Sequence, residues 1–412
     1  MNTEKLKSPF VGACLAFLII ASISLPSGSF FGIPVKHIAY ISSASSIIYL
    51  WLQRRSRIEP KLIILLTFSL AYTIFFMLVG SSKGIALPAH AIQEGTGVFT
   101  TISVALLGLI AINQKWTTAE DLIRYSVWGG TIFSLVKNAA AISMAAGIIS
   151  FPATQALFAN YLNAKFVSSA IFGGLVRVNL IIYDFVVLLI LSICLTYPQL
   201  TKDCGKKLLA IFKISAAICI FFAFSRYLFI GAALLILHSF LTKWSLRTKI
   251  AALIICVPAV ALNYSWFEGV IEQRFTSTQN IESDEKRTEQ INALVSQWSR
   301  SPWIGGGFGS YSTELIRDTS TPYSYEVQWF GFLTKLGIIG ITFPLFLIYL
   351  TIQSILRNNK PKEVGPIIIM LLLFIGGGFT NQYLITSGSG VFYLLCLSTA
   401  EAIRNRKQPE NA

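Results

Sequence analysis

The feature that most constrains this chain is a series of apolar segments that recurs from one end to the other. Twelve segments are each about long enough to cross ~30 Å of hydrocarbon as an α-helix. They lie at residues 10–26, 35–52, 61–79, 97–113, 126–150, 178–198, 208–224, 227–242, 250–266, 327–352, 366–382 and 387–403. Only 13% of the 412 residues are charged. The sequence therefore predicts an all-α polytopic membrane protein with about 12 transmembrane helices.

The basic residues indicate which ends of these helices face the cytoplasm. Most lysines and arginines fall in alternate connections, at residues 5–7, 54–61, 115–124, 202–207, 243–249, 357–362 and 404–407. The positive-inside rule assigns these connections, and both termini, to the cytoplasm. The net charge of +14 is then a signal of topology, and we expect no nucleic-acid partner.

The polar sequence is concentrated on the opposite, outer side. We expect one integral membrane domain, residues 1–412, with an extracytoplasmic loop at 267–326 between the ninth and tenth helices. A shorter outer loop covers about 151–177. The two halves of the chain differ in loop pattern, which weighs against a twelve-helix transporter built from repeats. This distribution favours an enzyme that works at the outer membrane face.

An amphipathic helix is predicted inside the long loop, over residues 286–300. Ile291, Leu294 and Trp298 recur there at helical spacing, and Arg287 falls on the same face. A cation in the first turn of a helix makes sense if an anion binds beside the free amide groups. Packing of the arginine stem along apolar surface is the alternative.

A glycine-rich stretch, Gly305-Gly306-Gly307-Phe308-Gly309, follows this helix. It lacks the spacing of dinucleotide or phosphate loops and does not follow a strand. We expect a tight turn that needs positive φ, or bare backbone that lets a ligand or the membrane domain approach closely.

Other charged and metal-ligating residues give weaker signals. With three histidines and no CxxC or HExxH motif, no metal site is expected. We interpret the acidic run Glu282, Asp284 and Glu285 as a solvated face instead of a cation site. Lys137 and Asp184 fall inside predicted spans, where we expect them to pair; a proton pathway is the transporter alternative.

Two more arginines are predicted at the outer level. Arg177 in GGLVRVN opens the sixth predicted span, and Arg226 in FSRYLFIG lies at the tight turn between the seventh and eighth. Each alone could be an interfacial anchor. Together with Arg287 they suggest a diphosphate site, because guanidinium groups bind phosphate oxygens in pairs.

These stretches resemble a known superfamily. The order SPWIGGGFGSY, a polar loop, then EVQWFGFLTKLGIIGITFPLFLIYL is similar to the carboxy-terminal half of O-antigen polymerases and ligases. SRYLFIGAALLIL and GGLVRVN resemble the arginine-bearing helix starts of that superfamily, so the resemblance spans roughly 165–350. It implies a GT-C-like glycosyltransferase of the bacterial inner membrane that acts at the periplasmic face on undecaprenyl-diphosphate-linked sugars. No metal and no cofactor is implied.

The resemblance also implies roles for individual residues. The donor diphosphate would be bound by Arg177, Arg226 and Arg287, and catalysis would depend on Arg287 and Glu326. Glu326 would orient or deprotonate the attacking hydroxyl, whereas a hydrogen bond that anchors the loop is the alternative. Aromatic side chains that could stack on sugar rings are Tyr311, Tyr323, Tyr325 and Trp329.

One departure from the superfamily pattern separates its branches. O-antigen ligases carry His-Asn just before the helix with the LGIIG glycines, whereas the corresponding position here is Glu326 and the loop has no histidine. The sequence therefore favours a Wzy-type polysaccharide polymerase that joins lipid-linked repeat units. An O-antigen ligase that transfers glycan to lipid A-core or another acceptor is the second hypothesis, and a glycolipid or solute transporter is the third. A chain-length regulator and a flippase are candidate partners.

Overall fold

A computed structural model describes residues 7–407, apart from 27, 56, 85, 163–166, 171–175, 243–244, 248, 251–267 and 269–277. Most of this chain is helical. The helices are α1 (Pro9–Ser24), α2 (Val35–Arg54), α3 (Pro60–Ser82), α4 (Pro88–Asn113), α5 (Ala119–Ala145), α6 (Phe151–Leu162), α7 (Ile181–Thr196), α8 (Lys206–Ala223), α9 (Arg226–Thr242), α12 (Thr278–Ser299), α13 (Gln328–Leu356), α14 (Pro361–Gly377) and α15 (Ser387–Lys407).

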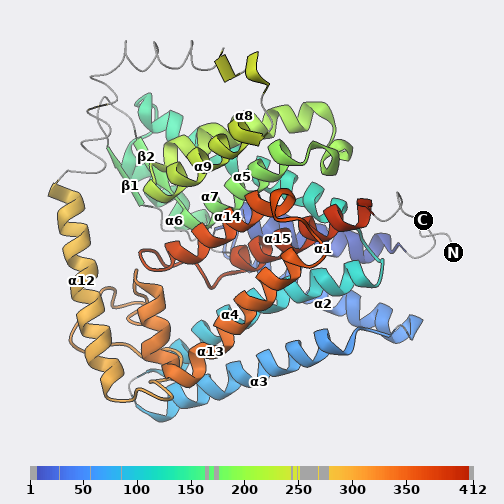
Figure 1. Cartoon of the computed structure of the whole chain (residues 1–412). Helices are drawn as coiled ribbons and strands as arrows, with labels where there is room; N and C mark the ends of the chain where they lie inside the picture. The colour runs from blue at the N-terminus through green and yellow to red at the C-terminus, as the bar shows by residue number, and fades with distance from the viewer. Residues whose placement is uncertain are drawn as a thin grey trace.

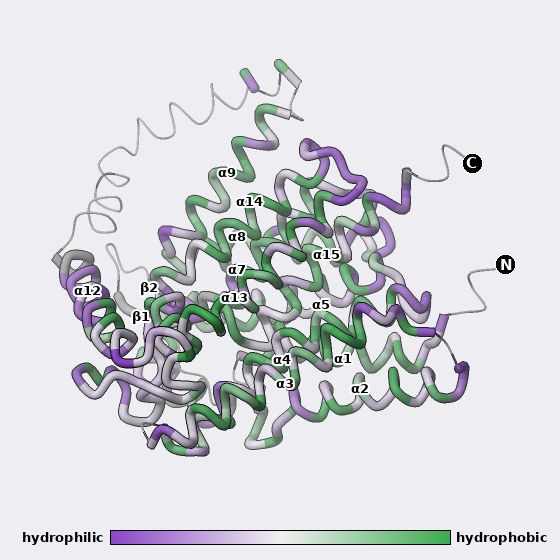
Figure 2. Tube along the Cα trace, turned by 60° about the horizontal axis from the view of Figure 1, so that its bottom comes forward, coloured by the Kyte–Doolittle hydropathy of each residue, from purple (hydrophilic) through white to green (hydrophobic). Residues whose placement is uncertain are grey.

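Eleven of the twelve predicted apolar segments coincide with helices, and the twelfth, 250–266, lies outside the described residues. By length and composition alone, α3, α4 and α13 are long and apolar enough to cross a membrane. Both termini lie on the side of the molecule opposite to α12 (Figure 1). The helices are largely apolar along their length, whereas α12 and the segments near the termini are hydrophilic (Figure 2).

The shorter outer loop has structure of its own, which corrects one expectation. Arg177 does not open a helix: it lies in β2 (Val176–Asn179), which pairs antiparallel with β1 (Val167–Ala170), and Ser169 is opposite Arg177. The sequence VRVN alternates β-branched and polar residues, which suits a strand. Helix α7 begins only at Ile181.

The core is centred on α7, whose residues from Tyr183 to Ile190 are buried. A charged pair lies in this core: Lys137 Nζ is 2.5 Å from Asp184 Oδ1, with side chains 1% and 0% exposed. Lys137 also donates to the Cys219 carbonyl at 3.0 Å, and the second Asp184 oxygen accepts from the Leu180 amide at 2.9 Å. The predicted pairing is confirmed, and these added hydrogen bonds offset the cost of burying two charges.

The outer loop is joined to α13 through a break in that helix at Gly337, which has φ 63° and ψ −174°. The carbonyls of Thr334 and Lys335 accept from the amides of Gly306 and Gly307, at 2.9 and 2.7 Å. The amides of the two residues after Gly337 donate instead to the carbonyls of Pro302 and Trp303. The backbone groups released by the break are therefore satisfied by the loop.

The glycine-rich stretch is confirmed as a place of close backbone approach to the membrane domain. Gly305, Gly307 and Gly309 all have positive φ. A Cβ on Gly307 would lie 2.0 Å from the amide nitrogen of Gly80 in α3, and one on Gly309 would lie 2.5 Å from the amide nitrogen of Ala91 in α4. Only glycine permits these contacts, so the stretch fixes where the loop lies.

A second buried ion pair holds the same loop. Lys335 Nζ lies 2.5 Å from Glu94 Oε1, and the two side chains are 4% and 8% exposed. Lys335 also donates to the Tyr323 carbonyl at 2.7 Å, and Glu94 accepts from the Gly309 amide at 2.7 Å. This pair therefore joins α4, α13 and both ends of the segment that leads to Glu326.

Candidate active site

Four separate elements bring charged side chains together at one end of the helical domain. Arg177 comes from β2, Arg226 is the first residue of α9, Arg287 lies in α12, and Glu326 precedes α13 by two residues. The first element is a hairpin strand, the next two are helices, and the last is the end of the glycine-rich loop segment. The site is therefore assembled by the tertiary structure.

Arg287 is the centre of the cluster. Its Nε lies 3.2 Å from Glu326 Oε2, and its Nη1 lies 2.5 Å from Asp284 Oδ1, one helical turn earlier. The Arg287 side chain is 20% exposed. Its guanidinium is thus held between two carboxylates and still open to solvent.

The two carboxylates each contact a second arginine. Glu326 Oε1 accepts from Arg317 Nη2 at 2.5 Å, so both of its oxygens are occupied by guanidinium groups. Asp284 Oδ1 lies 3.9 Å from Arg226 Nη2 as well as close to Arg287. A chain of alternating charges therefore runs from Arg226 to Arg317.

Arg177 lies within electrostatic range of the same cluster. Burial lowers the pKa of its guanidinium, and repulsion from Arg226 and Arg287 lowers it further, whereas Asp184 and Glu326 act in the opposite direction. The Nε of Arg177 is buried, and none of the residues that the structure describes accepts a hydrogen bond from it. A buried cationic donor without an acceptor costs free energy, and an anion placed beside it would recover that cost.

The position of α12 relative to Glu326 is set by hydrogen bonding and packing. Gln290, 4% exposed, accepts from the Glu326 backbone amide at 2.9 Å. Leu294 packs with Tyr325 and Val327 in a small apolar cluster. The predicted apolar face of the helix is therefore confirmed, with Arg287 at its edge.

The start of the helix is a correction. We expected Arg287 in the first turn, but α12 begins at Thr278, so Arg287 lies in the third turn. The residues before it, including Glu282 and Glu285, favour helix and extend it. The free amide groups at the start of α12 therefore cannot share an anion with Arg287. Other positive charges near Arg287 are those of Arg177 and Arg226.

Most of the aromatic residues suggested for sugar stacking are used in the packing of the loop. Tyr325 is 2% exposed; its hydroxyl accepts from the Ser312 amide at 2.8 Å. Burial raises the pKa of this hydroxyl to about 12. Tyr323 and Trp329 are 6% and 8% exposed, and Trp329 donates to the Ile375 carbonyl at 2.9 Å. Tyr311 is partly exposed and is the best placed of the four for a ligand contact.

Sequence reasoning missed three members of the site: Asp284, Arg317 and Gln290. Asp284 could have been found from its spacing of three residues before Arg287, once the helix was extended toward its start. It was interpreted as part of a solvated acidic run. Arg317 and Gln290 meet Glu326 only through the fold of the loop on α12, for which no local pattern exists.

The arrangement has the chemistry of an anion site whose arginines are paired with the protein's own carboxylates. Four guanidinium groups surround two carboxylates, so the cluster carries an excess of positive charge. Diphosphate oxygens form the same charge-assisted pairs with arginine as carboxylate oxygens do. A diphosphate could therefore replace Asp284 and Glu326 on these arginines.

Residues 210–345 match the family model described as O-antigen ligase. The match covers about a third of the chain and lies within the residues for which the sequence predicted the resemblance. It contains Arg226, Arg287, Arg317 and Glu326, whereas Arg177 precedes it. No curated protein matches the sequence.

Proposed function

We propose that this chain is a membrane glycosyltransferase that joins oligosaccharide repeat units carried on polyprenyl diphosphate. Through its residues 210–345 it belongs to the superfamily of O-antigen polymerases and ligases. The observation that carries the proposal is the arginine cluster around Asp284 and Glu326, which suits a diphosphate leaving group. Glu326, where ligases carry histidine, favours the polymerase branch.

Donor binding in this proposal is an exchange of anions. The diphosphate displaces Asp284 from Arg226 and Arg287, and it supplies an acceptor to the buried Nε of Arg177. Because carboxylates already hold the guanidinium groups close together, the main rearrangement is the turn of Arg287 from Glu326 to the diphosphate. The net excess of positive charge makes a doubly charged ligand the stronger competitor.

In the chemical step, a sugar hydroxyl of the acceptor attacks the anomeric carbon of the donor. The new glycosidic bond forms as the bond from that carbon to the diphosphate oxygen breaks, and the leaving diphosphate takes the electron pair. Arg177, Arg226 and Arg287 neutralise the charge that develops on it. The hydroxyl proton passes to the Glu326 carboxylate once Arg287 has turned to the diphosphate.

The role of Glu326 is tested by Glu326→Gln. If the carboxylate accepts the proton, chain extension from purified lipid-linked repeats should fall by roughly two or more orders of magnitude while donor binding survives. Glutamine retains the shape and one acceptor oxygen, so a purely anchoring role predicts nearly normal turnover. An active Gln variant would therefore refute the assignment of Glu326 as the base.

An O-antigen ligase is the second candidate, because the matching family model carries that description. The glycan profile of a deletion strain separates the two. Loss of the polymerase leaves lipopolysaccharide with single repeat units, whereas loss of the ligase leaves lipid A-core without O-antigen. Unchanged polymerisation with failed export would instead support a transporter.

The setting of the reaction is part of the same proposal. We place the protein in the inner membrane with about 12 transmembrane helices in a GT-C-like arrangement, both termini cytoplasmic and the arginine cluster periplasmic. The distribution of basic residues supports this orientation. A flippase that supplies lipid-linked repeats and a chain-length regulator are the partners that such a reaction needs.

A further inference from the structure

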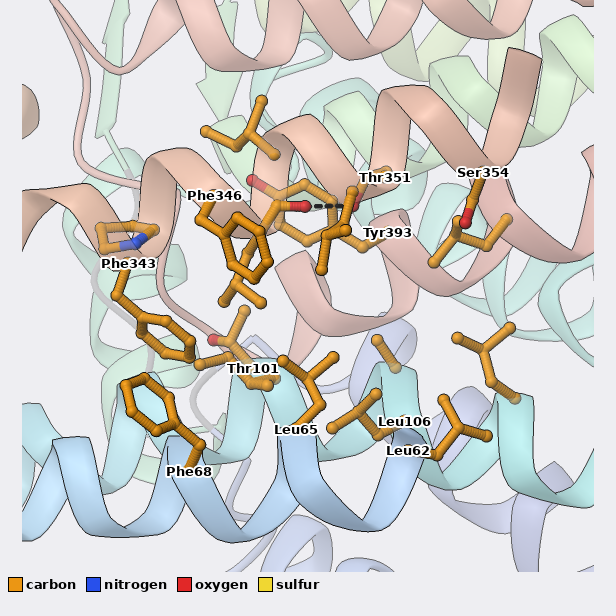
Figure 3. Close-up of a pocket in the computed structure, with 18 of the residues that line it drawn as sticks. Leu62, Leu65, Phe68, Thr101, Leu106, Phe343, Phe346, Thr351, Ser354 and Tyr393 are labelled. Carbon is orange, nitrogen blue, oxygen red and sulfur yellow. Dashed lines mark hydrogen bonds between the residues drawn. The ribbon is translucent and has the colours of Figure 1, made fainter. Parts of the chain in front are cut away.

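An apolar groove of about 1070 Å³ lies between α3 and α13, away from the arginine cluster. The two helices touch where the rings of Phe68 and Phe343 lie 4.9 Å apart. Beyond this contact the side chains of the two helices face each other across an open space (Figure 3). Its walls include Leu62 and Leu65 from α3 and Phe346 and Thr351 from α13.

The floor of the groove is formed by α4 and α15, which contribute Thr101, Leu106 and Tyr393 (Figure 3). The lining follows α13 from Trp329 to Arg357, and its part between Phe343 and Arg357 is about 21 Å long, given a rise of 1.5 Å per residue. This is about two-thirds of the ~30 Å hydrocarbon thickness of a bilayer. Extended acyl chains from one leaflet would fit this length.

Charged lining residues occur only at the end of the groove that faces the side of the termini. Lys61 lies 4.0 Å from Glu59, and Arg404 lies 3.8 Å from Glu401, so these four charges offset one another. Arg357 is exposed and forms no ion pair within the part of the chain that the structure describes. The groove therefore ends in one uncompensated cation.

The opposite end of the groove offers nothing to an anionic group. It is closed by Phe308 and Trp329, which are 1% and 8% exposed, and by Leu384. A lipid whose charged headgroup sits at the outer surface would find no cation in this lining. The charge distribution thus favours a lipid whose headgroup lies at the Arg357 end.

We propose that this groove binds an anionic diacyl phospholipid of the cytoplasmic leaflet. Its phosphate contacts Arg357, with Lys61 and Arg404 beside it, and its acyl chains fill the space between α3 and α13. Filling that space supports the contact between Phe68 of α3 and Phe343 of α13. The bound lipid stabilises the domain and takes no part in the glycosyl transfer.

Photo-crosslinking identifies the occupant directly. A photoreactive benzophenone amino acid at Leu350, which lines the groove, should capture an anionic phospholipid in membranes, and mass spectrometry of the adduct identifies it. Leu372 on α14, 54% exposed and outside the lining, is the matched control. A polyprenyl adduct at Leu350, or the same lipid mixture at both positions, would overturn the proposal.

The headgroup contact is tested on the purified chain with phosphatidylglycerol and phosphatidylcholine. In native mass spectrometry, Arg357→Gln should weaken retention of phosphatidylglycerol by about fivefold, as expected for one surface cation. Lys362→Gln removes a nearby exposed cation that does not line the groove, and it should change nothing. Equal retention by both variants, or equal retention of both lipids by the native chain, contradicts a specific headgroup site.

Discussion

The buried ion pair between Lys335 and Glu94 should contribute more to the stability of the loop before α13 than any exposed contact does. Among the described residues, Lys335→Met leaves the Glu94 carboxylate with one hydrogen-bond donor, the Gly309 amide, in a place where the Glu94 side chain is 8% exposed. Removing one partner of a buried pair costs about 3–5 kcal/mol. The variant also loses the hydrogen bond from Lys335 to the Tyr323 carbonyl. This loss destabilises the segment before Glu326, which follows three residues later.

The double variant Lys335→Met with Glu94→Gln should recover part of this loss. Glutamine is neutral and keeps an acceptor oxygen for Gly309, so no uncompensated charge stays buried. The remaining cost is that of the lost hydrogen bond to Tyr323, about 1–3 kcal/mol. The double variant should therefore be more stable than Lys335→Met alone, which is a strongly non-additive result.

The assay is equilibrium unfolding in mixed detergent micelles, with chain extension measured on the same preparations. Lys362→Met, at an exposed lysine in the first turn of α14, should shift stability by no more than about 0.5 kcal/mol. If the double variant were destabilised by the sum of the two single effects, the pair would not be the electrostatic unit that its geometry indicates.

Three further predictions address the site and its placement. Arg177→Lys keeps the cation but loses the guanidinium fork, so it should impair chain extension while protein abundance stays normal; full activity would make Arg177 an interface anchor. Asp284→Asn removes an internal competitor for the arginines, so titration should show tighter binding of a diphosphate-linked donor, whereas weaker binding would mean that Asp284 only orients Arg287. A cysteine at Ser283 should react with an impermeant thiol reagent in intact spheroplasts and one at Asn358 should not; equal labelling would reverse the orientation.

The amphipathic helix α12 shows which features the local sequence pattern predicts and which it does not. The spacing of Ile291 and Leu294 predicted a helix with an apolar face, and α12 has both. Its start was misplaced by two turns, because the charged residues before Lys286 are compatible with either helix or loop. Because of that error, Arg287 was predicted in the first turn of the helix, which in the structure begins at Thr278.

The conformation of the glycine-rich stretch was predictable from the sequence, but the backbone that it contacts was not. A run of glycines indicates either positive φ or close approach, and Gly307 has both. Nothing in the sequence indicated that the approached backbone would be that of Gly80, or that the amides of Gly306 and Gly307 would satisfy carbonyls released by the break at Gly337. Those partners are distant along the chain, so no periodicity connects them.

The sequence by itself determined the helices, because apolar runs of sufficient length and the placement of basic residues act locally on each segment. It also predicted that Arg226 would stand at the start of a helix, where α9 begins. Only the tertiary structure decided that Glu326 meets Arg287, since it comes from a loop 39 residues away, whereas Asp284 is a neighbour on the same helix. The same is true of Glu94 and Lys335, separated by 241 residues. Coulomb attraction over a few ångströms selects partners by position in space, and that position exists only after the helices have packed.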